Sequence, residues 1–128
     1  MFLLDTCSFL WMTMDPRGLS EQARAILAPR EQEIFVSAIS AFEIGIKVQK
    51  GKLQLSLPPS RWFKEALQLH DLQEIALKGE IAAISTELPL IHADPFDRIL
   101  IATAIEHRLT ILTPDPLIQK YPDVKWAW

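Results

Sequence analysis

The sequence has 128 residues, 49% of them hydrophobic, and a formal net charge of −3 at pH 7. We therefore predict a single domain over residues 1–128, with a core that needs no disulfide. The mild negative charge gives no support to a nucleic-acid binder, but it does not exclude one, because bound metal ions reverse the local field. The lone cysteine, Cys7, excludes an internal disulfide, and we interpret it as a small buried side chain in a reducing cytoplasm.

The predicted elements alternate between strands and helices. In chain order the patterns predict a strand at 2–4, a helix at 6–12, a turn at 15–18, a helix at 20–28, a strand at 34–36, helices at 37–50 and 58–67, a strand at 72–76, helices at 81–88 and 95–108, a strand at 110–112, a turn at 114–116 and an edge strand at 124–128. Ser20, Ser37 and Asp94 stand where helix N-caps are expected. The alternation predicts an α/β fold, with helices flanking a central, mostly parallel sheet.

The sequence carries no signal for a membrane. No stretch approaches the roughly 20 apolar residues that cross a bilayer. The first five residues lack the basic start and the length of a signal peptide. We expect a cytoplasmic protein with no membrane partner.

Two aspartates directly follow predicted strands. Asp5 comes after the strand at 2–4, and Asp115 follows the strand at 110–112. Sites in parallel sheets form beyond the carboxyl ends of the strands, where the strand order reverses, so we expect both aspartates at one edge of the sheet. Taken singly, Asp5 also fits a helix cap, and Asp115 between two prolines fits a turn.

Two further acids lie near the starts of predicted helices. Glu43 is in the second turn of its helix, with apolar residues at helical spacing on both sides, and so lies on a half-buried face. Asp97 is the third residue after the Asp94 cap and opens a helix that is apolar almost all round. Simpler roles are a pair of Glu43 with Lys47, one turn on, and a favourable interaction of Asp97 with the helix dipole.

Carboxylates from Asp5, Glu43, Asp97 and Asp115 at one edge of a sheet would repel one another. Such a cluster is costly unless cations fill it. Hard divalent cations prefer oxygen ligands, and Mg²⁺ keeps several waters and also binds phosphate. An ion held this way can activate water and stabilise the leaving oxygen of a phosphodiester, so the four acids predict a metal site for phosphodiester hydrolysis.

Four segments occur in a fixed order along nearly the whole chain. They are LLDT at 3–6, FEIGIK at 42–47 with GKL at 51–53, DPFDR at 94–98 with LIA at 100–102, and LTPD at 112–115. Together, at these separations, they resemble the PIN-domain ribonucleases, specifically the VapC-type toxins of toxin–antitoxin pairs. Many such relatives carry histidine where this chain has Cys7 and arginine where it has Ala93, so no particular RNA target is predicted.

The resemblance implies a PIN-like α/β/α sandwich and a Mg²⁺- or Mn²⁺-dependent endoribonuclease. It implies cleavage of single-stranded or looped RNA by metal-activated water, which leaves a 5′-phosphate and a 3′-hydroxyl. It assigns catalysis and metal binding to Asp5, Glu43, Asp97 and Asp115. It also implies a cognate antitoxin that blocks the site, and a homodimer. Residues beside the acids are then candidates for holding water or phosphate: Thr6, Thr113, Asp94 and Arg98.

Other functions fit parts of the pattern. An aspartate-nucleophile phosphatase also begins with a strand and an aspartate, but it needs a second aspartate where this chain has Cys7. A receiver-like signalling domain needs an acidic pair before a separate phosphoacceptor, and we find no such pair. A catalytically inactive PIN-fold binding module stays open from the sequence alone.

The remaining charged and aromatic residues each have two interpretations. Cations that either bind RNA phosphates or form a solvated face are Arg17, Lys47, Lys50, Lys52 and Arg98. Aromatic residues that either fill the core or line an antitoxin groove or dimer face are Trp11, Trp62 and Phe63. The histidines have no metal-ligand spacing, and we interpret all of them as structural: His70, His92 and His107.

Overall fold

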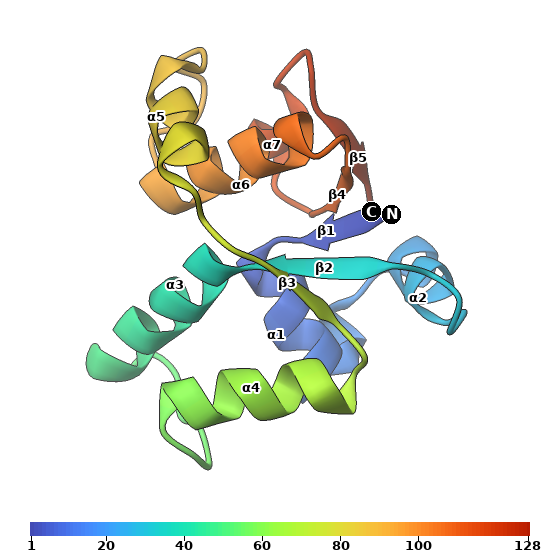
Figure 1. The fold of residues 1–128 in the computed structure, drawn as a ribbon. Coiled ribbons are helices and arrows are strands. Elements are labelled where there is room, and N and C mark those ends of the chain that lie inside the picture. Colours follow the sequence, from blue (N-terminus) through green and yellow to red (C-terminus); the bar gives the residue numbers. More distant parts are fainter.

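A parallel sheet forms the centre of the computed structural model, which describes residues 1–128 (Figure 1). Its strand order is β3-β2-β1-β4-β5, and every neighbouring pair is parallel. The strands are β1 (Phe2–Leu4), β2 (Ile34–Ser37), β3 (Gln73–Ile75), β4 (Thr110–Leu112) and β5 (Lys125–Ala127). All five predicted strands are therefore confirmed, and the edge strand near the C-terminus pairs with β4.

Each predicted helix is also present, within a few residues of its predicted ends. The helices are α1 (Thr6–Met14), α2 (Glu21–Leu27), α3 (Ala38–Gln49), α4 (Pro59–Leu69), α5 (Gly79–Glu87), α6 (Pro95–Glu106) and α7 (Pro116–Gln119). The predicted N-caps are confirmed, because Ser20, Ser37 and Asp94 accept hydrogen bonds from backbone N–H groups of their own helices. No helix has the length and apolar character needed to cross a membrane.

The helix α7 is a correction to the turn predicted at 114–116. The Asp115 side chain accepts a hydrogen bond from the Leu117 backbone N–H at 2.8 Å, and Pro116 stands at the first helical position. A capping aspartate followed by proline starts a helix as readily as it forms a turn. A turn and a helix start share the sequence Asp-Pro and differ only in the residues that follow the proline. Here those residues form a single helical turn.

Helices cover both faces of the sheet (Figure 1). Side chains alternate between the two faces of a strand, so neighbours in β1 enter different cores. Leu4 packs with residues of α1 to α4, including Phe9 and Phe63. Leu3 packs with residues of α6 and α7, including Leu100 and Ile118. The predicted layered α/β/α architecture is confirmed.

The aromatic residues considered for a partner groove pack inside the protein. Phe63 is 8% exposed, and its ring meets that of Phe9 edge-on at 5.8 Å between centroids. Trp62 also packs on Phe9, at 5.5 Å, while Trp11 packs on Trp128 at 5.7 Å. Core packing is therefore the role that the structure shows for Trp11, Trp62 and Phe63.

The strand order reverses next to β1. The chain adds β2 and then β3 on one side of β1, and it adds β4 and then β5 on the other. Leu4 and Leu112, the last residues of β1 and β4, are paired in register. The residues that come after these two strands therefore leave the sheet side by side, where parallel sheets form their sites.

Gly18 gives a direct test of packing around α1. A Cβ atom at this position would lie 2.4 Å from the ring of Trp11. The Trp11 ring packs on Trp128, which restricts any shift away from the new methyl group. We expect Gly18→Ala to destabilise the protein by about 1–3 kcal/mol, measured by urea unfolding. Gly79→Ala is the matched control, since nothing lies within 4 Å of its Cβ position. Equal stability of the two variants would contradict this packing.

Candidate active site

Asp5 is buried at the carboxyl end of β1, where it is 4% exposed. Its Oδ1 accepts a hydrogen bond from the Ser8 backbone N–H at 2.8 Å, which makes Asp5 the N-cap of α1. Its Oδ2 accepts a hydrogen bond from the Thr113 hydroxyl at 2.5 Å. Burial raises the pKa of Asp5, although the hydrogen bonds from Ser8 and Thr113 act in the opposite direction. Capping and membership of the acidic cluster, which the sequence presented as alternatives, occur together.

Two buried threonines connect the elements that carry the acids. Thr113 donates to Asp5 and accepts a hydrogen bond from the Asp115 backbone N–H at 3.0 Å. The Thr6 hydroxyl lies 3.0 Å from that of Ser40, which links α1 to α3. Because the Thr113 hydroxyl donates its proton to Asp5 inside the protein, it orients the two aspartates and does not face a phosphate.

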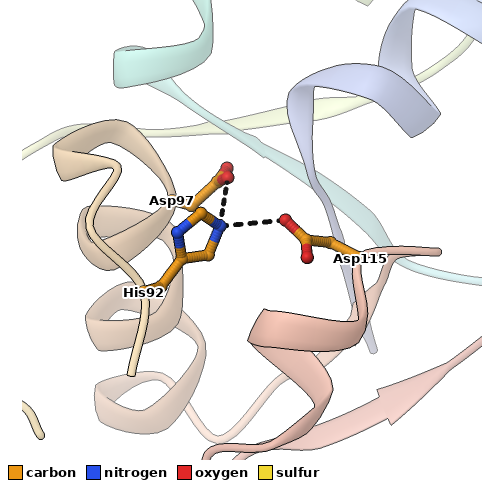
Figure 2. A group of neighbouring side chains, drawn as sticks. All are labelled: His92, Asp97 and Asp115. Carbon is orange, nitrogen blue, oxygen red and sulfur yellow. Dashed lines mark hydrogen bonds and ion pairs between the residues drawn. The ribbon is translucent and has the colours of Figure 1, made fainter. Parts of the chain in front are cut away.

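Asp97 and Asp115 approach the same nitrogen atom (Figure 2). His92 Nε2 lies 2.9 Å from Oδ2 of Asp97 and 2.9 Å from Oδ2 of Asp115. Our interpretation of His92 as a structural residue outside the site is therefore wrong. It rested on the absence of ligand spacing in the sequence, but the segment before α6 folds back and carries the imidazole between the two carboxylates.

Glu43 projects from the second turn of α3 and is half-buried. Its Oε1 is buried and has no hydrogen-bond partner. Burial raises the pKa of Glu43, as does the negative charge of Asp94, against the opposing effects of Thr6 and Lys47. A buried carboxylate oxygen without a partner costs free energy of folding, so a cation bound to this oxygen would stabilise the protein.

The charges of the four predicted acids act on one another. The pKa of Asp97 rises from 3.8 to about 7, first because of burial and then because of the charges of Asp94, Glu43 and Asp5, while His92 opposes the shift. Asp94 caps α6 through the Phe96 N–H at 2.8 Å. No lysine or arginine forms a salt bridge with any of these acids. The cluster therefore carries more negative charge than the protein neutralises.

The residues present fit a divalent cation. One ligand atom from each of His92, Asp97 and Asp115 lies within 4.8 Å of the others, and Glu43 offers an oxygen with no other partner. Carboxylate oxygens are the ligands that Mg²⁺ and Mn²⁺ prefer. The arrangement can hold such an ion and leave part of its coordination shell for water or a phosphate.

Arg98, predicted to contact substrate, points into the protein. It is 8% exposed, and its guanidinium donates to the backbone carbonyls of Ser85 (2.8 Å), Leu88 (3.0 Å) and Pro89 (2.9 Å). The prediction of a phosphate contact is wrong, because the donors of Arg98 fold the segment between α5 and α6. The sequence places a cation next to Asp97 but does not show which way its side chain points.

Cys7 is exposed in the first turn of α1, which corrects its interpretation as a buried side chain. Partial burial of the thiol and the negative charge of nearby Asp5 raise the pKa of Cys7 to about 11. The thiol therefore stays protonated near neutral pH, which makes it a poor metal ligand or nucleophile.

Among the predicted phosphate-binding cations, Lys47 is the one whose charge acts on the site. It lowers the pKa of both Glu43 and Cys7. Arg17 pairs instead with Asp15 at 2.9 Å on the surface. Lys47 is therefore the best placed of these cations to meet a nucleic-acid backbone beside the acids.

Comparison with known proteins agrees with this fold. The family model for the PIN domain matches residues 2–124, and the chain belongs to the PIN-domain family. It is 29% identical over 120 residues to Ribonuclease VapC22 of Mycobacterium tuberculosis, covering 93% of this chain and 90% of that protein.

Several solved structures share this fold. VapBC2 from Rickettsia felis, bound to a DNA fragment from its promoter, has a TM-score of 0.68 at 17% identity, and covers 98% of this chain and 96% of its own. FitAcB from Neisseria gonorrhoeae has a TM-score of 0.65 at 24% identity, with the same coverage of 98% and 96%. At these identities the likeness establishes the fold.

The raised carboxyl pKa values predict an unusual pH dependence in metal-free protein. Folded Asp97, with a pKa of about 7 against 3.8 for the free side chain, keeps its proton at pH values where the unfolded chain has lost it. Its contribution to stability is complete below about pH 4 and is lost as the pH rises to about 7. The free energy of unfolding in EDTA should therefore fall between pH 5 and pH 7.5.

Asp97→Asn is the control, because it removes this titration while keeping the shape of the side chain. The fall in stability between the two pH values should be smaller in this variant than in the wild-type protein. A wild-type protein whose stability falls over that interval no more than that of Asp97→Asn would contradict the raised pKa.

Proposed function

We propose that the chain is a Mg²⁺- or Mn²⁺-dependent endoribonuclease and the toxin of a toxin–antitoxin pair. The observation that carries the proposal is the convergence of buried and half-buried acids with no lysine or arginine partner. Asp97 and Asp115 contact one imidazole nitrogen, and Glu43 Oε1 is unpartnered. The resemblance to Ribonuclease VapC22 supports RNA as the substrate.

In this proposal Glu43, Asp97 and Asp115 hold the metal ion. Asp5, which the sequence also assigned to the metal, instead adds negative charge behind the ion, because both of its oxygens accept hydrogen bonds from the protein. The bound ion supplies activation of a water molecule and stabilisation of the leaving oxygen. Hydrogen bonds from Ser8 and Thr113 fix both oxygens of Asp5, so this carboxylate keeps its position while charge changes around it. Lys47 offers a cation to the RNA backbone at the edge of the site.

The arrangement does not favour the aspartate-nucleophile alternative. A phosphoryl-accepting carboxylate must reach its substrate, whereas Asp5 is 4% exposed and both of its oxygens accept hydrogen bonds from the protein. In hydrolysis by activated water, Asp5 does not have to reach the phosphorus atom. The attacking water also replaces the RNA 2′-hydroxyl as nucleophile, so the products carry a 5′-phosphate and a 3′-hydroxyl.

An antitoxin protein is the proposed partner. The solved structures of similar fold include a toxin–antitoxin complex from Klebsiella pneumoniae, with a TM-score of 0.62. A site that cleaves RNA with a small, open set of residues is dangerous to the cell that makes it. A bound protein that covers the acids would keep the enzyme inactive.

Cleavage of RNA by the purified chain, free of any antitoxin, tests the enzymatic proposal. A mixed pool of tRNA and mRNA fragments should be cut in Mg²⁺ or Mn²⁺ and left intact in EDTA. Asp97→Asn should lower the rate at least about 10–100-fold, the usual cost of disturbing a metal site. The new ends should be 5′-phosphates, and cyclic phosphate ends would contradict hydrolysis by activated water.

Glu106→Gln is the matched control for this experiment. It removes an exposed carboxylate from the far end of the helix that carries Asp97, and it should cleave at the wild-type rate. A folded wild-type protein that cuts no RNA with either metal would favour the inactive binding module. Cleavage that persists in Asp97→Asn would place the activity elsewhere.

Growth of a host cell tests the proposed toxin role. Expression of the chain alone should arrest growth, and Asp97→Asn should relieve the arrest at equal protein level. Co-expression of the protein encoded next to it should also relieve the arrest and should yield a complex that co-purifies. Arrest that persists in Asp97→Asn would separate toxicity from this site.

A further inference from the structure

His92 is the residue of the acidic cluster that the resemblance does not explain. Its Nε2 contacts carboxylate oxygens of Asp97 and Asp115, each at 2.9 Å (Figure 2). Two roles fit these distances. A deprotonated Nε2 would be a nitrogen ligand for the metal, whereas a protonated Nε2 would donate a hydrogen bond to Oδ2 of Asp115.

The other ring nitrogen distinguishes these roles. The backbone N–H of Asp94 donates to His92 Nδ1 at 3.2 Å. A backbone N–H is only ever a donor, so Nδ1 must present its lone pair, and a neutral ring then carries its proton on Nε2. The nitrogen between the carboxylates is therefore a donor, with no lone pair for a metal ion.

The protein holds this ring from several sides. The His92 backbone N–H donates to the Tyr121 hydroxyl at 2.9 Å, and Arg98 donates to the His92 carbonyl at 3.3 Å. The Tyr121 hydroxyl in turn donates to the Pro89 carbonyl at 2.9 Å. Tyr121, Arg98 and His92 are 3%, 8% and 9% exposed. These contacts fix the orientation of the His92 ring that contacts the acids.

We propose that His92 is a positioning residue, which donates its Nε2 proton to Oδ2 of Asp115 beside Asp97 and does not bind the metal. Oδ1 of Asp115 accepts a hydrogen bond from the Leu117 backbone N–H, so this carboxylate is held at both oxygens. Carboxylate oxygens have further lone pairs, with which Asp115 and Asp97 would meet the ion. This inference rests on the proposed function, since it concerns the same site. The ligand set is then entirely oxygen, which suits Mg²⁺ and Mn²⁺, whereas an imidazole ligand would favour Zn²⁺ or Ni²⁺.

The position of the proton can be tested without any metal. Long-range ¹H–¹⁵N NMR of metal-free protein labelled at histidine, with His92→Gln to assign the signal, distinguishes the two neutral forms of the ring and its charged form. We expect the form protonated at Nε2 alone for His92. A proton on Nδ1, in either the neutral or the charged ring, would overturn the inference independently of whether the protein is a nuclease.

Binding of Mn²⁺ tests the consequence for the metal site. Pulsed electron paramagnetic resonance of the wild-type protein with Mn²⁺ should show no ¹⁴N coupling of the strength that a directly bound imidazole gives. Such coupling would overturn the inference while leaving the proposed function intact. A wild-type protein that binds neither Mn²⁺ nor Mg²⁺ would contradict the proposed function, and this inference with it.

Two variants separate donation from ligation. His92→Gln places an amide N–H close to the position of Nε2 and offers no imidazole nitrogen, whereas His92→Leu offers neither. By calorimetry His92→Gln should bind Mn²⁺ within a few-fold of the wild-type protein, and His92→Leu about 10–100-fold more weakly. Circular dichroism checks that both variants fold. Binding by His92→Gln as weak as that of His92→Leu would overturn the inference.

Discussion

Negative charge concentrated at one edge of a parallel sheet is the constraint on which the rest of this structure depends. The strand order places the carboxyl ends of β1 and β4 side by side, so Asp5 and Asp115 are neighbours in space although they are far apart in sequence. The helices α3 and α6 add Glu43 and Asp97. Burial and mutual repulsion then raise the pKa values of Asp5, Glu43 and Asp97. A fold that keeps these acids together without a lysine or arginine partner loses stability, and in the proposed function a divalent cation would restore it.

The protein holds these acids with hydroxyl, backbone and imidazole donors rather than with lysine or arginine. Thr113 holds Asp5 and the backbone of Asp115, while His92 reaches Asp115 and Asp97. The one buried arginine, Arg98, satisfies backbone carbonyls instead of neutralising Asp97 next to it. Because the Arg98 guanidinium points away from the acids, their negative charge stays unneutralised. The acids therefore lower the stability of the metal-free protein, which is common at active sites.

The order of strands and helices could be predicted from the sequence, as could the local positions of Asp5 and Asp97, because these features depend on local patterns. Asp5 follows an apolar run and Asp97 follows a capping residue, and both positions hold in the structure. The environments of His92, Arg98 and Cys7 could not be predicted, because each depends on how distant segments meet. Contacts with Tyr121, 29 residues after His92 in the sequence, place that histidine. The single domain, the homodimer and the cytoplasmic location stay predictions.

Anomalous diffraction from crystals soaked in Mn²⁺ is the sharpest test of a metal site at these acids, because it locates the ion without reference to activity or to any substrate. We expect one or two peaks at the carboxyl edge of the sheet, within about 2.0–2.6 Å of carboxylate oxygens of Glu43, Asp97 and Asp115. Soaked crystals of Asp97→Asn should lose or weaken these peaks. A strong peak elsewhere in the molecule, or an ordered cluster of acids with no peak at millimolar Mn²⁺, would contradict a metal site at this edge.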